Sequence, residues 1–350
     1  MYNPFSKLLT KFNKSIGIDL GTSNTLIYLR DRGIVANESS VVAINNRTNQ
    51  IVAVGEEARK MLGKTPPHIV ASKPLIDGVV SDFETTEKML QYFMNKVQRQ
   101  SSFFSPRPRV IVGIPLDITE VEKKAVEDAV LSAGAKEVKL VESIMAAAIG
   151  ARVPIQDPTG NMIVNIGGGL TEIAVISLGG IVNWRSLKLA GEELDRDIIK
   201  YAREEFNLLL GERVAEEIKI KVGSAHPLEK PLDYRMRGRD LLSGLPREVI
   251  VTDGQIREAL SRTIKTILEN IRTTLETTPP ELIADILQKG IILTGGSSLL
   301  HGLERYLAIG TQIPVQVADD AITCTVRGLG TILENESLLK EIALPSTQGA

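Results

Sequence analysis

Three short turns rich in glycine and hydroxyl side chains are the parts of this sequence best suited to bind phosphate. Each follows an apolar run typical of a buried strand, and they span residues 19–25, 165–169 and 294–298. Glycine lets backbone N–H groups approach an anion closely, and the hydroxyls of Thr22, Ser23 and Ser298 can add donors. One such turn is more often a plain hairpin or helix entry, but three together favour a polyphosphate site.

Two of the turns occupy equivalent places in an internal repeat. With an offset of 146 positions, residues 18–21 align with residues 164–167, Thr25 with Thr171, and Gly33 with Gly179. Each half therefore begins with a strand, a glycine turn, a second strand, a turn and a third strand. A duplicated pair of turns that face each other would grip a polyphosphate from both sides.

The elements that must position these turns alternate between short β-rich runs and amphipathic helices. Strands are predicted at residues 15–20, 25–29, 34–35, 40–44, 51–54, 109–114, 138–141, 290–293 and 313–317. Helices are predicted at residues 56–62, 83–98, 120–133, 145–151, 192–210, 215–222 and 253–276, with a capping box at Thr119 and Glu122 and a polar segment at residues 224–244. The fold class is α/β.

Composition excludes several other classes of protein. A chain of 350 residues suggests two domains, and a net charge of −2 gives no electrostatic reason to expect a nucleic acid partner. The single cysteine, Cys324, and three scattered histidines argue against a disulfide and a zinc site. There is neither a signal peptide nor an apolar run of about 20 residues, so we expect a cytoplasmic protein.

The first 14 residues are predicted to form an amphipathic membrane-binding segment. At 100° per residue, Lys7, Lys11 and Lys14 lie opposite an apolar arc, a pattern suited to an anionic membrane interface. The arc consists of Tyr2, Phe5, Leu8, Leu9 and Phe12. The alternative is a terminal helix that packs on the core of the chain itself.

Seven segments of the chain resemble the MreB/Mbl family of bacterial actins, within the actin, Hsp70 and sugar-kinase superfamily of ATPases. They are GIDLGTSNT (residues 17–25), VGEEA (54–58), PLIDGV (74–79), MAAAIG (145–150), RGRD (237–240), PPEL (279–282) and LTGG (293–296). The resemblance covers essentially the whole chain.

The resemblance implies an actin-like fold, in which two duplicated α/β domains surround a nucleotide cleft and each carries a smaller inserted subdomain. Domain I would comprise residues 15–150 and 322–340, with its smaller subdomain at about 33–77. Domain II would comprise residues 151–321, with its smaller subdomain at about 185–248. The implied ligands are ATP or ADP together with Mg²⁺.

The resemblance also assigns roles to individual residues. Glu216 and Lys219 would contact ribose and adenine, although by themselves they read as a solvated i,i+3 pair on a helix. Asp19 would hold Mg²⁺ through water. The phosphates would lie against Gly21, Thr22, Ser23, Asn24, Gly167, Gly168 and Gly169, and the adenosine against Gly295, Gly296 and Ser297, with Ser298 in the same turn.

Three positions depart from family members that hydrolyse ATP. Such members have an acid at Ser143, an aspartate at Asn165 and a threonine at Leu170; the duplicated partner of Asn165 is Asp19. The acid and the threonine position the attacking water, and the aspartate helps to hold the water shell of Mg²⁺, so we expect very low ATPase activity and no intact catalytic residue. Glu142 is a doubtful substitute because adjacent strand residues point to opposite faces. The alternative is that other residues position the water.

The function that the resemblance implies is an ATP-binding filament on the inner face of the cell membrane, where it scaffolds cell shape and wall synthesis. Phe103 and Phe104 lie where the family carries a membrane-touching loop. The implied partners are further copies of the chain, an anionic membrane, a homologous bacterial actin, and membrane proteins of cell shape and wall synthesis. Two alternatives remain: a nucleotide-locked paralogue that caps or modulates filaments of an active homologue, and a small-metabolite kinase of the same superfamily.

Overall fold

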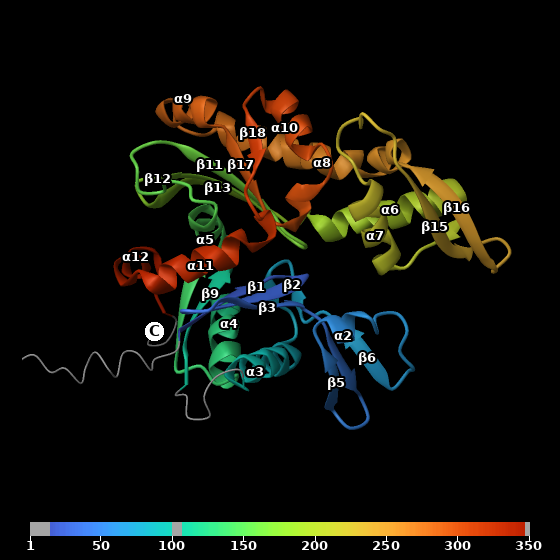
Figure 1. Cartoon of the computed structure of the whole chain (residues 1–350), viewed down its shortest axis with the longest axis horizontal. Coiled ribbons are helices and arrows are strands. Elements are labelled where there is room, and N and C mark those ends of the chain that lie inside the picture. The colour runs from blue at the N-terminus through green and yellow to red at the C-terminus, as the bar shows by residue number, and fades with distance from the viewer. Residues whose placement is uncertain (1–14, 100–106, 347–350) are drawn as a thin grey trace, which may run out of the picture. The chain divides into compact units, whose positions relative to one another are not determined.

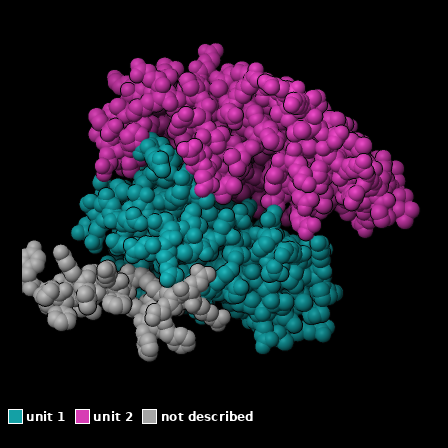
Figure 2. All heavy atoms as spheres, in the orientation of Figure 1, with its two compact units in different colours: residues 1–153, 323–350 teal, residues 154–322 magenta. Residues whose placement is uncertain are grey.

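The computed structural model describes residues 15–99 and 107–346, and the chain divides into two compact units (Figures 1 and 2). Unit 1 comprises Met1–Val153 with Thr323–Ala350, and unit 2 comprises Pro154–Ile322. Each unit contains a five-stranded mixed sheet with helices packed on it, which confirms the α/β class.

The sheet of unit 1 has the strand order β10-β9-β1-β2-β3. Its strands are β1 (Ser15–Leu20), β2 (Asn24–Leu29), β3 (Gly33–Ser39), β9 (Arg109–Ile114) and β10 (Glu137–Glu142). Its helices are α3 (Phe83–Arg99), α4 (Glu120–Ser132), α5 (Ser143–Gly150), α11 (Cys324–Glu334) and α12 (Glu336–Ile342). Strand β1 pairs antiparallel with β2 and parallel with β9.

Alternation along β1 explains why both faces of this sheet are covered. Ile16 and Ile18 belong to the buried cluster that contains the apolar residues of α3 and α4, whereas Gly17 between them lies against Leu329 of α11. A strand that is buried on both faces reads as a continuous apolar run, which is the pattern predicted for residues 15–20. Figure 1 shows α3 and α4 on one side of β1 to β3 and α11 on the other.

The sheet of unit 2 repeats this arrangement, with the order β13-β12-β11-β17-β18. Its strands are β11 (Asn161–Ile166), β12 (Thr171–Ser177), β13 (Gly180–Leu187), β17 (Ile291–Thr294) and β18 (Val315–Val317). Strand β11 pairs antiparallel with β12 and parallel with β17, as β1 does with β2 and β9. Leu20 pairs with Thr25 and Ile166 with Thr171, so both hairpins close at positions 146 residues apart (166 − 20). The predicted duplication is therefore confirmed.

The helices of unit 2 pack around a large buried cluster of this unit. They are α6 (Gly191–Phe206), α7 (Glu212–Val222), α8 (Asp253–Glu276), α9 (Pro280–Lys289) and α10 (Leu303–Thr311), with the short 3₁₀ turns η1 (Gly296–Leu299) and η2 (Ala321–Thr323). Helix α8 has the predicted bounds.

Smaller sheets extend each unit. In unit 1, β5 (Gln50–Val54), β4 (Val42–Asn45) and β6 (Ile69–Ser72) form a sheet beside α2 (Glu56–Arg59), and β7 (Leu75–Ile76) pairs with β8 (Val79–Val80). In unit 2, β14 (Leu208–Leu209), β15 (Asp233–Asp240) and β16 (Pro246–Thr252) form another. The bounds of the smaller subdomains stay predictions.

Local structure departs from the sequence prediction mainly in unit 2. The polar segment at residues 224–244 contains β15, and α9 follows Pro279 where the chain was expected only to end a helix. Helix α6 ends at Phe206 instead of residue 210 because Asn207 adopts a left-handed conformation (φ 50°) and β14 follows. The predicted capping box is confirmed: Thr119 accepts from the Glu122 N–H, and Glu122 accepts from the Thr119 N–H.

Candidate functional site

The first glycine turn joins β1 to β2 and is braced by residues of the segment that follows β3. The Ser40 hydroxyl donates to the Gly21 carbonyl at 2.6 Å, and the Ser40 N–H donates to the Ser23 carbonyl at 2.9 Å. The Thr22 hydroxyl oxygen accepts from the Gly78 N–H at 2.8 Å, which leaves the Thr22 O–H as a possible donor. The turn is thus fixed through its carbonyl groups and one side chain.

The second turn joins β11 to β12 and is held in the same way by other segments. The Gly167 N–H donates to the Leu170 carbonyl at 2.9 Å and closes the turn. The Gly167 carbonyl accepts from the Ser297 hydroxyl at 2.7 Å and from the Gly191 N–H at 3.1 Å. The Gly168 carbonyl accepts from the Glu192 N–H at 2.8 Å. As in the first turn, hydrogen bonds to backbone carbonyl groups hold this turn in place.

Both turns leave two backbone N–H groups without partners at equivalent places. Within residues 15–99 and 107–346, the N–H groups of Thr22, Ser23, Gly168 and Gly169 make no hydrogen bond, although Thr22 and Gly169 are buried. Buried N–H groups almost always have a partner, so an unbonded N–H on one buried residue in each turn, next to a second on a partly buried residue, indicates a ligand with acceptor atoms. Successive free N–H groups in a turn form a typical anion site.

Asp19 is the last but one residue of β1, is partly exposed at its surface, and has no counter-charge among the described residues. Burial raises the pKa of its carboxyl to about 7. A desolvated carboxyl without a cationic neighbour fits a divalent metal ion, whose charge would favour the ionised form. No group of three or more His, Cys, Asp or Glu side chains gathers in the described ranges.

The duplicated partner of Asp19 has a different environment. Asn165 lies near the end of β11, where it pairs with Thr294 of β17. Its side-chain amide oxygen accepts a hydrogen bond from the Thr294 hydroxyl at 3.2 Å. An amide carries no charge and cannot replace a carboxylate at a metal site. Asn165 therefore ties the second turn to β17.

The residues predicted to contact adenosine lie on α7 and in the turn after β17. Lys219 is 13% exposed, and its ammonium group donates to the Gly191 carbonyl at 2.7 Å and pairs with Asp195 at 2.8 Å. Ser297 reaches the second phosphate turn, as described above. Glu216 is partly buried on the same helix as Lys219. The structure thus brings Lys219, Ser297 and the turn at Gly167 together around Gly191.

The turn after β17 owes its shape to glycine. Gly295 has φ +86°, and a side-chain carbon there would lie 2.3 Å from the Ile166 carbonyl oxygen. Gly296 is exposed, whereas Ser298 is fully buried and its hydroxyl donates to the Gly295 carbonyl at 2.6 Å. The hydroxyl of Ser298, predicted as an additional phosphate donor, is therefore used inside the turn.

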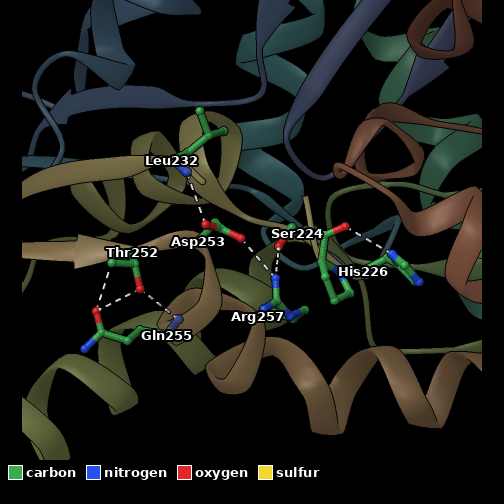
Figure 3. A network of polar contacts seen from close by, with 8 residues as sticks. Ser224, His226, Leu232, Thr252, Asp253, Gln255 and Arg257 are labelled. Atoms are coloured by element: carbon green, nitrogen blue, oxygen red, sulfur yellow. Dashed lines mark hydrogen bonds and ion pairs between the residues drawn. The ribbon is translucent and has the colours of Figure 1, made fainter. Parts of the chain in front are cut away.

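A polar network anchors the segment that follows α7 (Figure 3). Arg257 donates to the Ser224 hydroxyl at 3.2 Å and pairs with Asp253 at 3.0 Å, while Asp253 accepts from the Leu232 N–H. Ser224 also forms a β-bridge with His301, just beyond η1. The end of α7 and the turn after β17 are therefore tied together as well.

Ser143 and Leu170, two of the three positions that depart from the hydrolytic pattern, lie at the start of α5 and in the second turn. Ser143 is the first residue of α5 and lies beside Gly113 of β9. The Glu142 side chain makes no capping hydrogen bond, and burial raises the pKa of its carboxyl. Leu170 lies in the second turn, where its carbonyl accepts from Gly167 and its side chain has no polar atom.

The predicted membrane residues cannot be placed. Tyr2, Phe5, Leu8, Leu9, Phe12, Phe103 and Phe104 lie outside the described residues. In the part of the chain that the structure describes, no helix combines the length and the apolar character needed to cross a membrane.

Sequence reasoning missed Gly191 and Asp195. Gly191 begins α6, and any side chain there would meet the Ser297 hydroxyl at 2.5 Å. Its only signal was a glycine directly before the predicted start of a helix at residue 192. Asp195 follows one turn later and gave no signal, because its partner Lys219 is on another helix.

Known proteins resemble this chain over nearly its whole length. A family described as MreB/Mbl protein matches residues 13–341. The cell shape-determining protein Mbl of Bacillus cereus is 48% identical over 95% of this chain and 99% of its own length. The cell shape-determining protein MreB of Escherichia coli is 46% identical over 92% of this chain and 94% of its own length.

A solved structure of the same family also resembles this chain. MreB5 of Spiroplasma citri bound to ADP superimposes with a TM-score of 0.89 and 36% identity, and the match covers 94% of this chain and 98% of that one. The chain therefore belongs to the MreB/Mbl family of bacterial actins and has their actin-like fold.

Proposed function

We propose that this chain binds ATP, or ADP, together with Mg²⁺ through the two glycine turns. The observation that carries the proposal is the set of four unbonded N–H groups, on Thr22, Ser23, Gly168 and Gly169, at duplicated positions. Asp19 would hold Mg²⁺ through water, and the metal would neutralise the charge of the phosphates. Lys219 and Ser297 would lie on the adenosine side. The relative MreB5, solved with ADP, supports a nucleotide as the ligand.

The proposed role is a filament of many copies of the chain on the inner face of the cell membrane, where it scaffolds cell shape and wall synthesis. The names of the Mbl and MreB relatives, which are cell shape-determining proteins, support this role. The predicted amphipathic segment at residues 1–14 would supply the membrane contact.

Hydrolysis is proposed to be very slow. Phosphoryl transfer to water depends on positioned groups, and this chain has Ser143, Asn165 and Leu170 where hydrolytic relatives have the positioning residues. The Asn165 amide oxygen already accepts from Thr294, and Leu170 offers no polar side-chain atom. ATP binding would survive, because the backbone N–H groups of the turns are intact.

The same substitutions favour one second candidate, a nucleotide-locked paralogue that caps or modulates filaments of an active homologue. A small-metabolite kinase is disfavoured, because such an enzyme needs a catalytic carboxylate near the phosphates and Asn165 and Ser143 provide none.

Sedimentation with Mg-ATP separates the two candidates, and calorimetry tests the site. The wild-type protein should bind ATP, and Gly168→Val should abolish binding, because a branched side chain blocks the approach of phosphate to the turn. Gly254→Ala, at the start of α8, is a control that should bind as the wild type does. A pellet that requires nucleotide supports the filament, and soluble ATP-bound protein supports the paralogue. Equal ATP affinity in Gly168→Val would contradict the two-turn site.

A further inference from the structure

A continuous chain of contacts leads from Asp195 to the second phosphate turn. Asp195 pairs with the Lys219 ammonium at 2.8 Å, and Lys219 donates to the Gly191 carbonyl at 2.7 Å. The Gly191 N–H donates to the Gly167 carbonyl at 3.1 Å, and the next N–H, on Glu192, donates to the Gly168 carbonyl at 2.8 Å. Asp195 therefore holds Lys219, Lys219 holds Gly191, and the first turn of α6 holds the phosphate turn.

Helix α6 sets the geometry of this chain. Gly191 and Asp195 are four residues apart, so they lie on the same face of the helix, and Lys219 of α7 bridges them. The bridge is tight, because a side-chain carbon on Gly191 would come within 3.3 Å of the Lys219 Nζ atom and 3.2 Å of the Gly167 carbonyl oxygen. The first turn of α6 and the phosphate turn are thus packed backbone against backbone.

The charge of Asp195 is what makes this position of Lys219 favourable. The two side chains are 14% and 13% exposed. An ammonium group that is this buried is costly unless an anion lies beside it, and removal of one partner leaves the other charge uncompensated. Without the Asp195 carboxylate, Lys219 would turn toward solvent and release the Gly191 carbonyl.

We propose that Asp195 is a positioning residue for the second phosphate turn, and that it acts through Lys219 and Gly191. The proposal rests on the proposed nucleotide site. One Lys219 N–H donates to the Gly191 carbonyl and the ammonium charge lies 2.8 Å from the Asp195 carboxylate, so this side chain is already engaged within the protein. The main effect of the ion pair is therefore on phosphate binding: it keeps the free N–H groups of Gly168 and Gly169 in place.

The test compares Asp195→Asn with a matched control, Asp197→Asn, on the same helix. Asp197 accepts from the Thr263 hydroxyl of α8 at 2.5 Å and takes no part in the chain of contacts. Calorimetry with Mg²⁺ measures the affinity for ATP and for inorganic tripolyphosphate. In Asp195→Asn both affinities should fall by the same factor of about ten, because the buried Lys219 ammonium loses its counter-charge and no longer holds the Gly191 carbonyl. The control should keep both affinities. Loss of ATP affinity with unchanged tripolyphosphate affinity would overturn the proposal, because the ion pair would then act on adenosine.

A second measurement, amide hydrogen exchange, needs no ligand. It therefore tests the role of Asp195 independently of nucleotide binding. Hydrogen exchange of the nucleotide-free protein reports on the Gly191 and Glu192 N–H groups. Their exchange should be at least tenfold faster in Asp195→Asn than in the wild type or Asp197→Asn. Unchanged exchange would overturn the proposal even if ATP binds. Faster exchange without ATP binding would show that Asp195 holds the turn and would contradict the nucleotide site instead.

If Asp195→Asn fails to fold, Asp195→Glu keeps the charge but shifts the carboxylate. It should show intermediate exchange and intermediate affinity for tripolyphosphate. Wild-type values for both would overturn the proposal.

Discussion

At the scale of single residues, Asp19 links the candidate site to pH. Burial raises the pKa of its carboxyl from 3.8 to about 7, so between these values the folded protein without metal holds a proton that the unfolded chain releases. The free energy of unfolding should therefore fall as the pH rises through this window and level off above about pH 7.

Asp19→Asn should remove that part of the pH dependence, because an amide does not titrate. Urea unfolding at several pH values without Mg²⁺ measures the slope, and Asp233→Asn, an exposed position on β15, is the control. Mg-ATP binding below pH 7 should also release a proton, which calorimetry in buffers of different ionisation enthalpy detects. An identical slope in wild type and Asp19→Asn would contradict the role given to Asp19.

The three departures at Ser143, Asn165 and Leu170 predict the rate of turnover. Removal of one positioned group commonly costs about 10²–10³ in rate, and such losses are not additive. Ser143→Glu, Asn165→Asp and Leu170→Thr together should therefore raise steady-state phosphate release by about 100-fold or more, while each single change does little. ATP affinity, measured in parallel, should stay similar. Wild-type release as fast as that of a bacterial actin with all three groups would show that other residues position the water.

At the scale of elements, the crossing of α5 and α11 in unit 1 depends on two glycines. A side-chain carbon on Gly150 would lie 1.8 Å from the Cys324 carbonyl oxygen, and one on Gly328 would lie 1.8 Å from the Ala146 carbonyl oxygen. The two backbones are in direct contact, and neither can give way without separation of the helices.

Gly150→Ala and Gly328→Ala should each lower the free energy of unfolding by about 1–3 kcal/mol or more, the usual cost of overpacking. Gly254→Ala in α8 is the matched helical control: its nearest neighbour would be the end of the Arg257 side chain at 3.4 Å, and alanine is the better helix former. Urea unfolding compares the three variants. Equal stability of Gly150→Ala and Gly254→Ala would mean that the helices separate freely.

Elements with a strong local pattern could be predicted from the sequence, and the others could not. Helix α8 had a clear apolar stripe and was followed by Pro279 and Pro280, and its predicted bounds were correct. Strand β15 was missed because arginines fill its exposed face, although their alternation at Arg235, Arg237 and Arg239 was a period-two signal. The contacts around Gly191 could hardly be predicted from the sequence. Gly191, Lys219, Ser297 and Gly167 come from four separate segments that only the tertiary fold brings together.

At the scale of the whole molecule, the duplication was the most informative feature of the sequence. A fixed offset predicted that each half begins with a strand, a glycine turn, a second strand, a turn and a third strand. Both halves do, and their five-stranded sheets also share one strand order. The duplication also exposed the charge lost at Asn165, since its partner is Asp19. Departures from an internal repeat can thus point to a changed site without any relative for comparison.

Attachment of the whole molecule to a membrane is predicted from two segments that lie outside the described residues. Segment 1–14 would place Phe5 and Phe12 in the bilayer interface and its lysines near anionic headgroups, and Phe103 and Phe104 would enter the same surface. The wild-type protein should sediment with vesicles that contain anionic lipid and much less with neutral ones, because each lysine near an anionic surface contributes about 1 kcal/mol.

Deletion of residues 2–12 should abolish most of this binding, and Phe103→Ser with Phe104→Ser should weaken what remains, because both remove apolar area from the interface. Replacement of Lys7, Lys11 and Lys14 by glutamine separates charge from apolar burial: it should remove the preference for anionic lipid but keep weak binding to neutral vesicles. Circular dichroism and ATP calorimetry confirm that each variant is folded. If the terminal helix instead packs on the core, the deletion will lower the free energy of unfolding and leave vesicle binding unchanged. Wild-type sedimentation with anionic vesicles after both the deletion and the Phe103/Phe104 change would exclude these segments as the membrane contact.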